Sequence, residues 1–182
     1  KELVRFADES HLFRIDHFLG KEAIMNILGF RFANRIFQPI WNAANIASVE
    51  ISFDATLALE GRAGYYDKAG ALADMIQSHL LQVLALLAME PPVSLEAESL
   101  RDEKVKVLRS IRPLDPPQLA SHAVRAQYAG YQQEAGVAAG SHTETYAALK
   151  LYVDNWRWRD VPFYLRTGKR LGSPKKPMRV SV

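Results

Sequence analysis

The order of helix-like and strand-like patterns along the chain constrains its fold more than any other feature. Apolar residues that recur at spacings of three and four predict three helices, at 21–41 (ending near Pro39), at about 71–88 and at 94–111. Alternating or β-branched segments predict strands at 46–53, 123–128, 145–153, 162–166 and 178–182. Because the strands cluster late and do not alternate regularly with helices, the sequence predicts an α+β domain, with helices packed on a largely antiparallel sheet.

Glycine and proline mark the predicted breaks between these elements. Gly61, Gly64 and Gly70 surround Tyr65-Tyr66-Asp67, which predicts a loop or turn. Pro91-Pro92 closes the second helix. Pro113, Pro116 and Pro117 end the third helix.

Composition limits the classes of partner. The net charge of +3 is small and its charges are interspersed, which argues against a nucleic-acid partner and leaves an anionic small molecule as a candidate. The longest apolar run, Leu80–Met89, is shorter than the ~20 residues that span a bilayer, so no membrane partner is expected. The absence of cysteine excludes disulfides and thiolate metal sites, and it mildly favours a reducing compartment, with the cytoplasm as the expected location.

Length and chain ends bear on domain organisation. The 182 residues suit one globular unit with one substantial core. The chain opens with Lys1, without a signal-peptide pattern, and stops at Val182 within a strand-like alternation. We therefore expect that one or both ends were cut from a longer protein.

Common catalytic and nucleotide-binding motifs are missing from the sequence. It contains no Gly-x-Gly-x-x-Gly and no Gly-Lys-Ser/Thr loop, so no cofactor-binding residues are expected in this chain. Gly140-Ser141-His142 lacks the flanks of a nucleophile elbow. His11 and His17 have no partner motif at zinc spacing, so no metal site is expected.

The segment 14–22 gathers acidic and basic side chains at the start of the first predicted helix, among them Asp16, His17 and Lys21. A helix start offers unpaired N–H groups and a positive dipole end, and His17 and Lys21 would add positive charge, which suits a phosphate. The simpler alternative is that Asp16 caps the helix or forms a salt bridge, while Lys21 is merely solvated.

His79 lies within the second predicted helix. On an ideal helix it shares a face with Leu72, Met75, Val83 and Leu86, which indicates a core histidine. A histidine held among apolar groups with one carboxylate partner could nevertheless serve as a general base near neutral pH, which is the less favoured alternative on periodicity alone. Asp74 projects about 140° away on an ideal helix, so both can reach one ligand only across the helix or if the helix is irregular.

Nine segments together resemble the glucose-6-phosphate dehydrogenase family, in the order in which that family has them. The resemblance covers nearly the whole chain and starts with Arg14-Ile15-Asp16-His17-Phe18-Leu19-Gly20-Lys21-Glu22. The other eight segments are 31–37, 39–42, 60–62, 79–82, 88–92, 101–108, Thr143-Glu144-Thr145-Tyr146 and 162–169.

The resemblance implies oxidation of β-D-glucose 6-phosphate at C1 to 6-phosphogluconolactone, with hydride transfer to NADP, as in the pentose phosphate pathway. His79 matches the family's general base, and Asp16 matches the carboxylate that orients this base and stabilises its imidazolium form. Four further residues match substrate ligands, namely His17 and Lys21 for the phosphate, Asp74 for a sugar hydroxyl, and Lys169.

The same resemblance implies parts that these 182 residues do not contain. The family binds NADP, and in some members NAD, mainly through an N-terminal domain that precedes the signature. We therefore expect residues 1–182 to form part of the substrate-binding and catalytic domain, which by itself would neither bind NADP nor turn over. Family members are commonly dimers or tetramers that associate through the sheet of this domain, which implies a homo-oligomer.

Three departures from the family pattern weaken the transfer of these roles, and the first two favour an alternative. Phe18 stands where a tyrosine is usual, and Ala55 stands where a sugar-binding glutamate is usual. The stretch between Gln127 and Ser141 is also shorter than expected. Lost hydrogen bonds to a polar ligand cost about 0.5–1.5 kcal/mol each, so weaker binding or another sugar phosphate would follow. The alternative is a non-catalytic paralogue, a binding or oligomerisation module that retains the fold.

Overall fold

The computed structural model describes residues 5–8, 11–12 and 16–182, which form helices packed on a five-stranded sheet. The helices are α1 (Glu22–Phe32), α2 (Ala63–Ala71), the π-helix η4 (Leu72–Leu80), α3 (Leu81–Ala88), α4 (Ala97–Arg109) and α5 (Pro116–His122), with 3₁₀ turns η3 (Gln38–Ile40) and η5 (Tyr131–Gln133). The strands are β1 (Ser48–Asp54), β2 (Ala123–Ala126), β3 (Tyr146–Tyr152), β4 (Pro162–Gly168) and β5 (Met178–Ser181).

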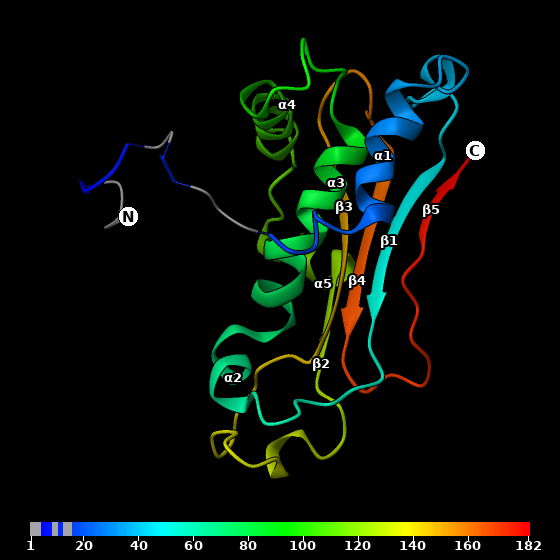
Figure 1. The fold of residues 1–182 in the computed structure, drawn as a ribbon. Helices are drawn as coiled ribbons and strands as arrows, with labels where there is room; N and C mark the ends of the chain where they lie inside the picture. Colours follow the sequence, from blue (N-terminus) through cyan, green and yellow to red (C-terminus); the bar gives the residue numbers. More distant parts are fainter. Residues whose placement is uncertain (1–4, 9–10, 13–15) are drawn as a thin grey trace.

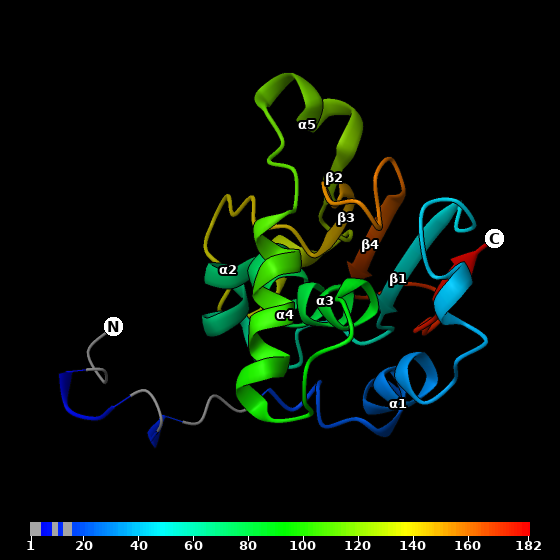
Figure 2. The same ribbon diagram turned by 90° about the horizontal axis from the view of Figure 1, so that it is seen from above.

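The sheet has the strand order β2-β3-β4-β1-β5. Strands β1 and β4 are parallel, whereas the other three pairs are antiparallel. Helices α1, α3 and α4 lie on one face of the sheet, and α2 lies beyond the end where β1 and β4 finish (Figures 1 and 2). The predicted α+β class with a largely antiparallel sheet is confirmed.

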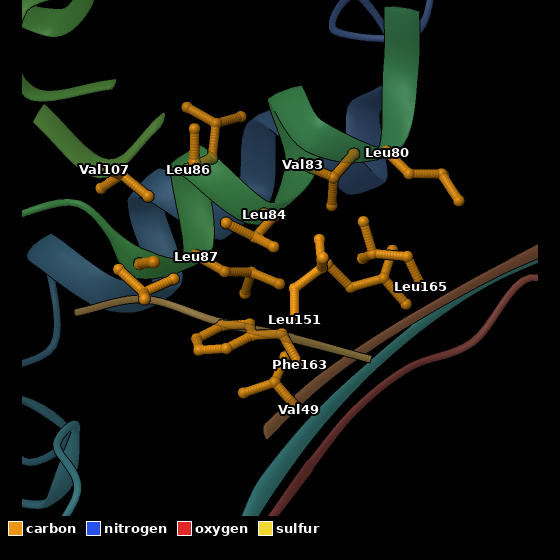
Figure 3. Packing of buried hydrophobic residues seen from close by; sticks show 14 of the residues in the cluster. Val49, Leu80, Val83, Leu84, Leu86, Leu87, Val107, Leu151, Phe163 and Leu165 are labelled. Carbon is orange, nitrogen blue, oxygen red and sulfur yellow. The ribbon is translucent and has the colours of Figure 1, made fainter. Parts of the chain in front are cut away.

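The core lies between α3 and the sheet. Val83, Leu84 and Leu87 of α3 face Val49, Leu151, Phe163 and Leu165 of the strands (Figure 3). Every residue of α3 from Val83 to Ala88 is buried. A helix that is apolar all round is stable only inside a protein, which explains why α3 is sandwiched between the sheet and α4.

Three side chains cap the carbonyl end of α3. Trp41 and Trp158 donate their indole N–H groups to the carbonyls of Leu87 and Ala88, each at 2.8 Å. The buried guanidinium of Arg31 donates to the carbonyls of Leu86 and Met89. The last carbonyls of a helix have no partner within it, so these donors satisfy groups that would otherwise be buried unpaired.

The first helix ends at Phe32, earlier than the predicted end near Pro39. The side chain of Asn34 donates to the carbonyls of Gly29 and Phe30, which would otherwise bond to the next turn of a longer helix. Asparagine favours such local bonds over helix continuation. The other predicted helices and strands are present with shifts of a few residues at their ends.

Two short helices lie where only breaks were predicted. In α2 the predicted glycine loop is helical because Tyr66 is buried beside Leu59, Ala63 and Tyr131 in a second apolar cluster. In α5 the prolines occupy the first helical positions, where a missing N–H is tolerated. Asp115 and the glutamine of the first turn form a capping box there.

Residues 63–88, which comprise α2, η4 and α3, form one helical stretch of 26 residues. By length and composition this stretch could cross a membrane, although half of its most apolar window is buried inside the domain. Gly70 also breaks its regularity, with φ 66° and ψ 175°. Its packing against the sheet is that of a core helix.

Candidate active site

A cleft of about 220 Å³ opens at the end of the sheet where β1 and β4 finish. Residues that follow two neighbouring parallel strands meet at the same edge, and the amide of Ala55 donates to the carbonyl of Gly168 at 2.8 Å. Segment 17–21 and helix η4 supply the other walls. The lining residues are His17, Phe18, Lys21, Phe53, Ala55, Leu57, Arg62, Tyr66, Asp74, Met75, His79, Thr167, Gly168 and Lys169.

The six candidate site residues come together at this cleft. His17, Lys21, Asp74, His79 and Lys169 line it. The sixth, Asp16, lies beside His79. Arg14 and the isoleucine after it, which open the signature segment, fall outside the described residues.

Asp16 holds one nitrogen of His79. Oδ1 of Asp16 lies 2.9 Å from Nδ1 of His79, and the same oxygen accepts the backbone N–H of Phe18 at 2.8 Å. A carboxylate can only accept, so Nδ1 carries the proton and Nε2 keeps its lone pair in the neutral ring. The arrangement is that of a general base with an orienting acid. The N-cap of α1 is Lys21, so Asp16 does not cap that helix.

Aromatic contacts fix the plane of the His79 ring. The ring stacks on Phe18, with centroids 4.9 Å apart and an angle of 18° between planes. His17 meets the same ring edge-on at 5.0 Å. The His79 side chain remains 15% exposed and lines the cleft, which decides against the alternative of a sealed core histidine.

Helix η4 brings Asp74 and His79 to the same cleft. On an ideal α-helix these residues diverge, whereas the hydrogen bonds of a π-helix join residues five apart, so residues with this spacing lie about one turn from each other. The helix is therefore irregular in the way that a shared ligand requires. One oxygen of Asp74 accepts the hydroxyl of Tyr65 at 3.2 Å, which orients the carboxylate.

The cleft collects positive charge. Burial, and secondarily the charge of Lys176, lower the pKa of Lys21, against an opposing effect of Asp16. Burial, and secondarily Arg62, lower the pKa of Lys169. Among the described residues neither ammonium lies within 4.0 Å of a carboxylate oxygen. A bound anion would stabilise these crowded and partly desolvated cations. The cleft is therefore suited to an anionic ligand.

Lys21 and Lys169 pack their ammonium groups on aromatic rings of the cleft. Nζ of Lys21 lies 3.8 Å from the ring centre of Phe18. Nζ of Lys169 lies 4.8 Å from that of Tyr66. These cation–π contacts hold the long side chains near the cleft without an ion pair to a carboxylate.

Sequence reasoning missed three polar groups around this cleft. Arg62 and Thr167 line it, and Lys176 packs its ammonium 4.7 Å from the ring centre of Phe53 at its edge. Arg62 belongs to a segment that resembles the family, which was the one available signal for it. Lys176 comes from the loop before β5, and no local pattern in the sequence connects that loop with residues 17–21.

The two substitutions that depart from the family pattern both face this cleft. Phe18 is 4% exposed and supplies the ring under His79. Ala55 lies in the wall where a longer side chain would reach into the cleft. The preceding Asp54 points to the other side of the strand and accepts a hydrogen bond from Arg166 at 2.7 Å, so it does not replace the missing glutamate.

Asp16, His17 and His79 are the described residues that could jointly hold a metal ion, with ligand atoms within 4.8 Å of one another. A bound cation would have to displace the proton between Asp16 and His79. It would also lie near Lys21, whose charge interacts with Asp16. The positive surroundings make a phosphate a better ligand than a cation for this cleft.

A larger hollow of about 540 Å³ lies at the turn between β3 and β4. Its principal charged groups are already paired, since Arg112 donates two hydrogen bonds to Asp154. The smaller cleft is therefore the candidate active site, because within the described part of the chain Lys21 and Lys169 have no carboxylate oxygen within 4.0 Å.

The fold and this site define a class of α+β domains in which a histidine–aspartate pair lies beside a cleft lined with cations. Residues 28–182 match the family model "Glucose-6-phosphate dehydrogenase, C-terminal domain", and residues 1–26 match "Glucose-6-phosphate dehydrogenase, NAD binding domain". The chain therefore belongs to the glucose-6-phosphate dehydrogenase family.

Individual relatives and solved structures agree with this assignment. The chain is 50% identical to a glucose-6-phosphate 1-dehydrogenase of Zymomonas mobilis, over 93% of this chain and 36% of the relative. It is 53% identical to the Treponema pallidum protein of the same name, over 90% of this chain and 34% of the relative. The chain thus spans about a third of the length of these relatives.

The fold matches solved structures of the same family. The Mycobacterium avium glucose-6-phosphate 1-dehydrogenase superposes with a TM-score of 0.90 at 44% identity, covering 98% of this chain and 39% of that one. A glucose-6-phosphate dehydrogenase in complex with its substrate glucose-6-phosphate superposes with a TM-score of 0.89 at 41% identity, covering 98% and 38%.

Proposed function

We propose that the protein that contains this chain oxidises β-D-glucose 6-phosphate at C1 to 6-phosphogluconolactone and transfers hydride to NADP. The observation that carries the proposal is the pair of His79 and Asp16 beside a cleft lined with Lys21 and Lys169. Relatives of about 50% identity named glucose-6-phosphate 1-dehydrogenase support the substrate. A structural neighbour in complex with glucose-6-phosphate also supports it.

The two ends of the cleft bind different parts of the substrate, the phosphate at one end and the sugar at the other. His17 and Lys21 bind the phosphate at the start of α1, where helix N–H groups and the dipole add to their charge. Asp74 accepts a hydrogen bond from a sugar hydroxyl, and Lys169 donates one. These contacts hold C1 near His79, so binding energy from the phosphate end orients the reacting end.

The chemical step removes two hydrogens from C1 and its oxygen. Nε2 of His79 takes the proton of the C1 hydroxyl, and the imidazolium that forms is stabilised by Asp16. The C1–H bond breaks at the same time, its hydrogen leaves as hydride, and the C1–O bond becomes the carbonyl of the lactone. The nicotinamide supplies the acceptor for that hydride.

The coenzyme, the assembly and the location complete the proposal. We assign NADP as the coenzyme, with NAD as the alternative, and we assign its binding mainly to the nucleotide-binding domain, because this chain has no glycine-rich fingerprint. A homo-oligomer, a dimer or tetramer, is proposed through the sheet, where Val124 and Tyr164 are exposed. A place in the pentose phosphate pathway and a cytoplasmic location belong to the same proposal.

A binding module without catalysis is the second candidate, and Phe18 and Ala55 favour it. Full-length protein is mixed with glucose 6-phosphate and either NADP or NAD, and absorbance of the reduced nicotinamide is followed. Steady reduction supports the dehydrogenase. No reduction with either coenzyme, together with calorimetric binding of glucose 6-phosphate, would establish the binding module instead.

A further inference from the structure

The segment Thr143-Glu144-Thr145 joins the elements that carry the site, although none of its residues lines the cleft. The hydroxyl of Thr143 donates to the carbonyl of Asp67 in α2 at 2.6 Å. The carbonyl of Thr145 accepts the backbone N–H of Lys169 at 2.9 Å. Between them, Glu144 bonds to the start of helix η4.

Glu144 satisfies two backbone donors at the start of this helix. Its carbonyl accepts the N–H of Ala71 at 2.9 Å, and Oε1 of its side chain accepts the N–H of Leu72 at 3.0 Å. The first N–H groups of a helix have no partner within it, and a negative charge beside them is stabilised by the helix dipole. Glu144 therefore holds the helix from the loop before β3, 72 residues away in sequence from Leu72.

Gly70 makes room for this carboxylate. Its φ of 66° lies in the left-handed region, which favours glycine. A Cβ at this position would meet Oε1 of Glu144 at 2.5 Å, closer than real contacts allow. The kink at Gly70 and the carboxylate of Glu144 thus fit each other, and together they set where η4 begins.

The position of that start matters because η4 carries Asp74 and His79. Both residues face the cleft only because their helix has π-type bonding, as described above. A shift of the helix start toward α-type bonding would rotate one of them away from the other. The phosphate ligands His17 and Lys21 belong to another segment, which contacts η4 through the side chain of His79.

We propose that Glu144, through its fit to Gly70, is a positioning residue that holds η4 in the register in which Asp74 and His79 act on one ligand. The inference rests on the proposed dehydrogenase function for its kinetic consequence. It assigns to the segment 143–145 a role distinct from that of the phosphate-binding segment 17–21.

The test uses full-length protein with the variants Glu144→Ala and Glu144→Gln and the control Glu98→Ala, which removes an exposed glutamate of α4. Misplacement of a catalytic group by about 1 Å costs on the order of 100-fold, so kcat of E144A should fall about 10- to 100-fold. Calorimetric affinity for inorganic phosphate should stay at the parent value. E144Q should recover most of kcat, because its amide oxygen can still accept the N–H of Leu72.

Hydrogen exchange gives a readout that does not depend on activity. The amide of Leu72 should exchange faster in E144A than in the parent and in E144Q. Parent kcat in E144A, unchanged exchange at Leu72, or equal loss of phosphate binding in both variants would each overturn the proposal. If the parent reduces neither coenzyme, the dehydrogenase function is refuted instead, and the exchange experiment still decides on Glu144.

Discussion

Nδ1 of His79 lies 2.9 Å from Oδ1 of Asp16, although the two residues are 63 positions apart in the chain. The backbone N–H of Phe18 bonds to the same oxygen, and the ring of Phe18 stacks on the imidazole. One short segment therefore fixes the carboxylate, the tautomer and the plane of the histidine, and leaves its second nitrogen for a ligand.

Replacement of His79 by asparagine should lower kcat by at least about 100-fold, since general-base catalysis contributes 10²–10⁴. Asparagine cannot take the C1 hydroxyl proton, while the phosphate ligands remain in place. Steady-state kinetics of full-length protein with glucose 6-phosphate measure the effect. His142→Asn, which changes an exposed histidine, should retain parent kinetics. A parental kcat in H79N would remove His79 from the mechanism.

Phosphate affinity should fall as the pH rises toward 10.5, the ordinary pKa of lysine. Burial lowers the pKa of Lys21 and of Lys169 in the free protein, and a bound dianion favours their protonated forms. Affinity is therefore full below these lowered pKa values and is lost as the pH rises through them. The phosphate ester of glucose 6-phosphate stays a dianion above about pH 7, since the second pKa of a phosphate monoester is about 6.

Calorimetry with glucose 6-phosphate between about pH 7.5 and 10 tests this dependence, with proton uptake expected at the alkaline end. Lys21→Met should weaken binding and reduce that uptake. Lys68→Met, which changes an exposed lysine of α2, should do neither. An affinity that is constant across the range would show that these ammonium groups do not contact the anion.

Ala55→Glu should tighten binding of glucose 6-phosphate. Ala55 lies in the cleft wall, where a carboxylate could accept a sugar hydroxyl. One added hydrogen bond of about 0.5–1.5 kcal/mol corresponds to a roughly 2- to 12-fold lower KM. Asp54→Ala, which removes a neighbouring carboxylate that points away from the cleft, is the control. It shows how KM changes when a substitution in this segment does not touch the ligand. A higher KM in A55E would refute the account of a missing ligand.

Trp158→Phe should destabilise the domain by about 1–3 kcal/mol, because the buried carbonyl of Ala88 loses its donor. Trp158 is fully buried, whereas Trp156, two residues earlier, is 97% exposed. Trp156→Phe should therefore change the free energy of unfolding by less than about 0.5 kcal/mol. Urea unfolding of both variants measures the difference, and equal stabilities would contradict the proposed cap of α3.

Local patterns predicted the α+β class and most helices and strands, because apolar periodicity is a property of neighbouring residues. Helix α2 was missed because burial of Tyr66 against Tyr131 overrides the glycines around it. Helix α5 was missed because the prolines that signal a break also suit a first turn. The parallel pairing of β1 with β4 was not predicted either, since no pattern within a strand encodes its distant partner.

The sequence by itself determined the family, the residue types of the site and the apolar faces that build the core. Only the tertiary structure decided that Asp16 meets His79 and that Asp74 shares their cleft. The physical reason is that both facts depend on contacts between distant segments. The first is a bond across 63 residues, and the second is a π-helix whose start is held by Glu144 at Gly70.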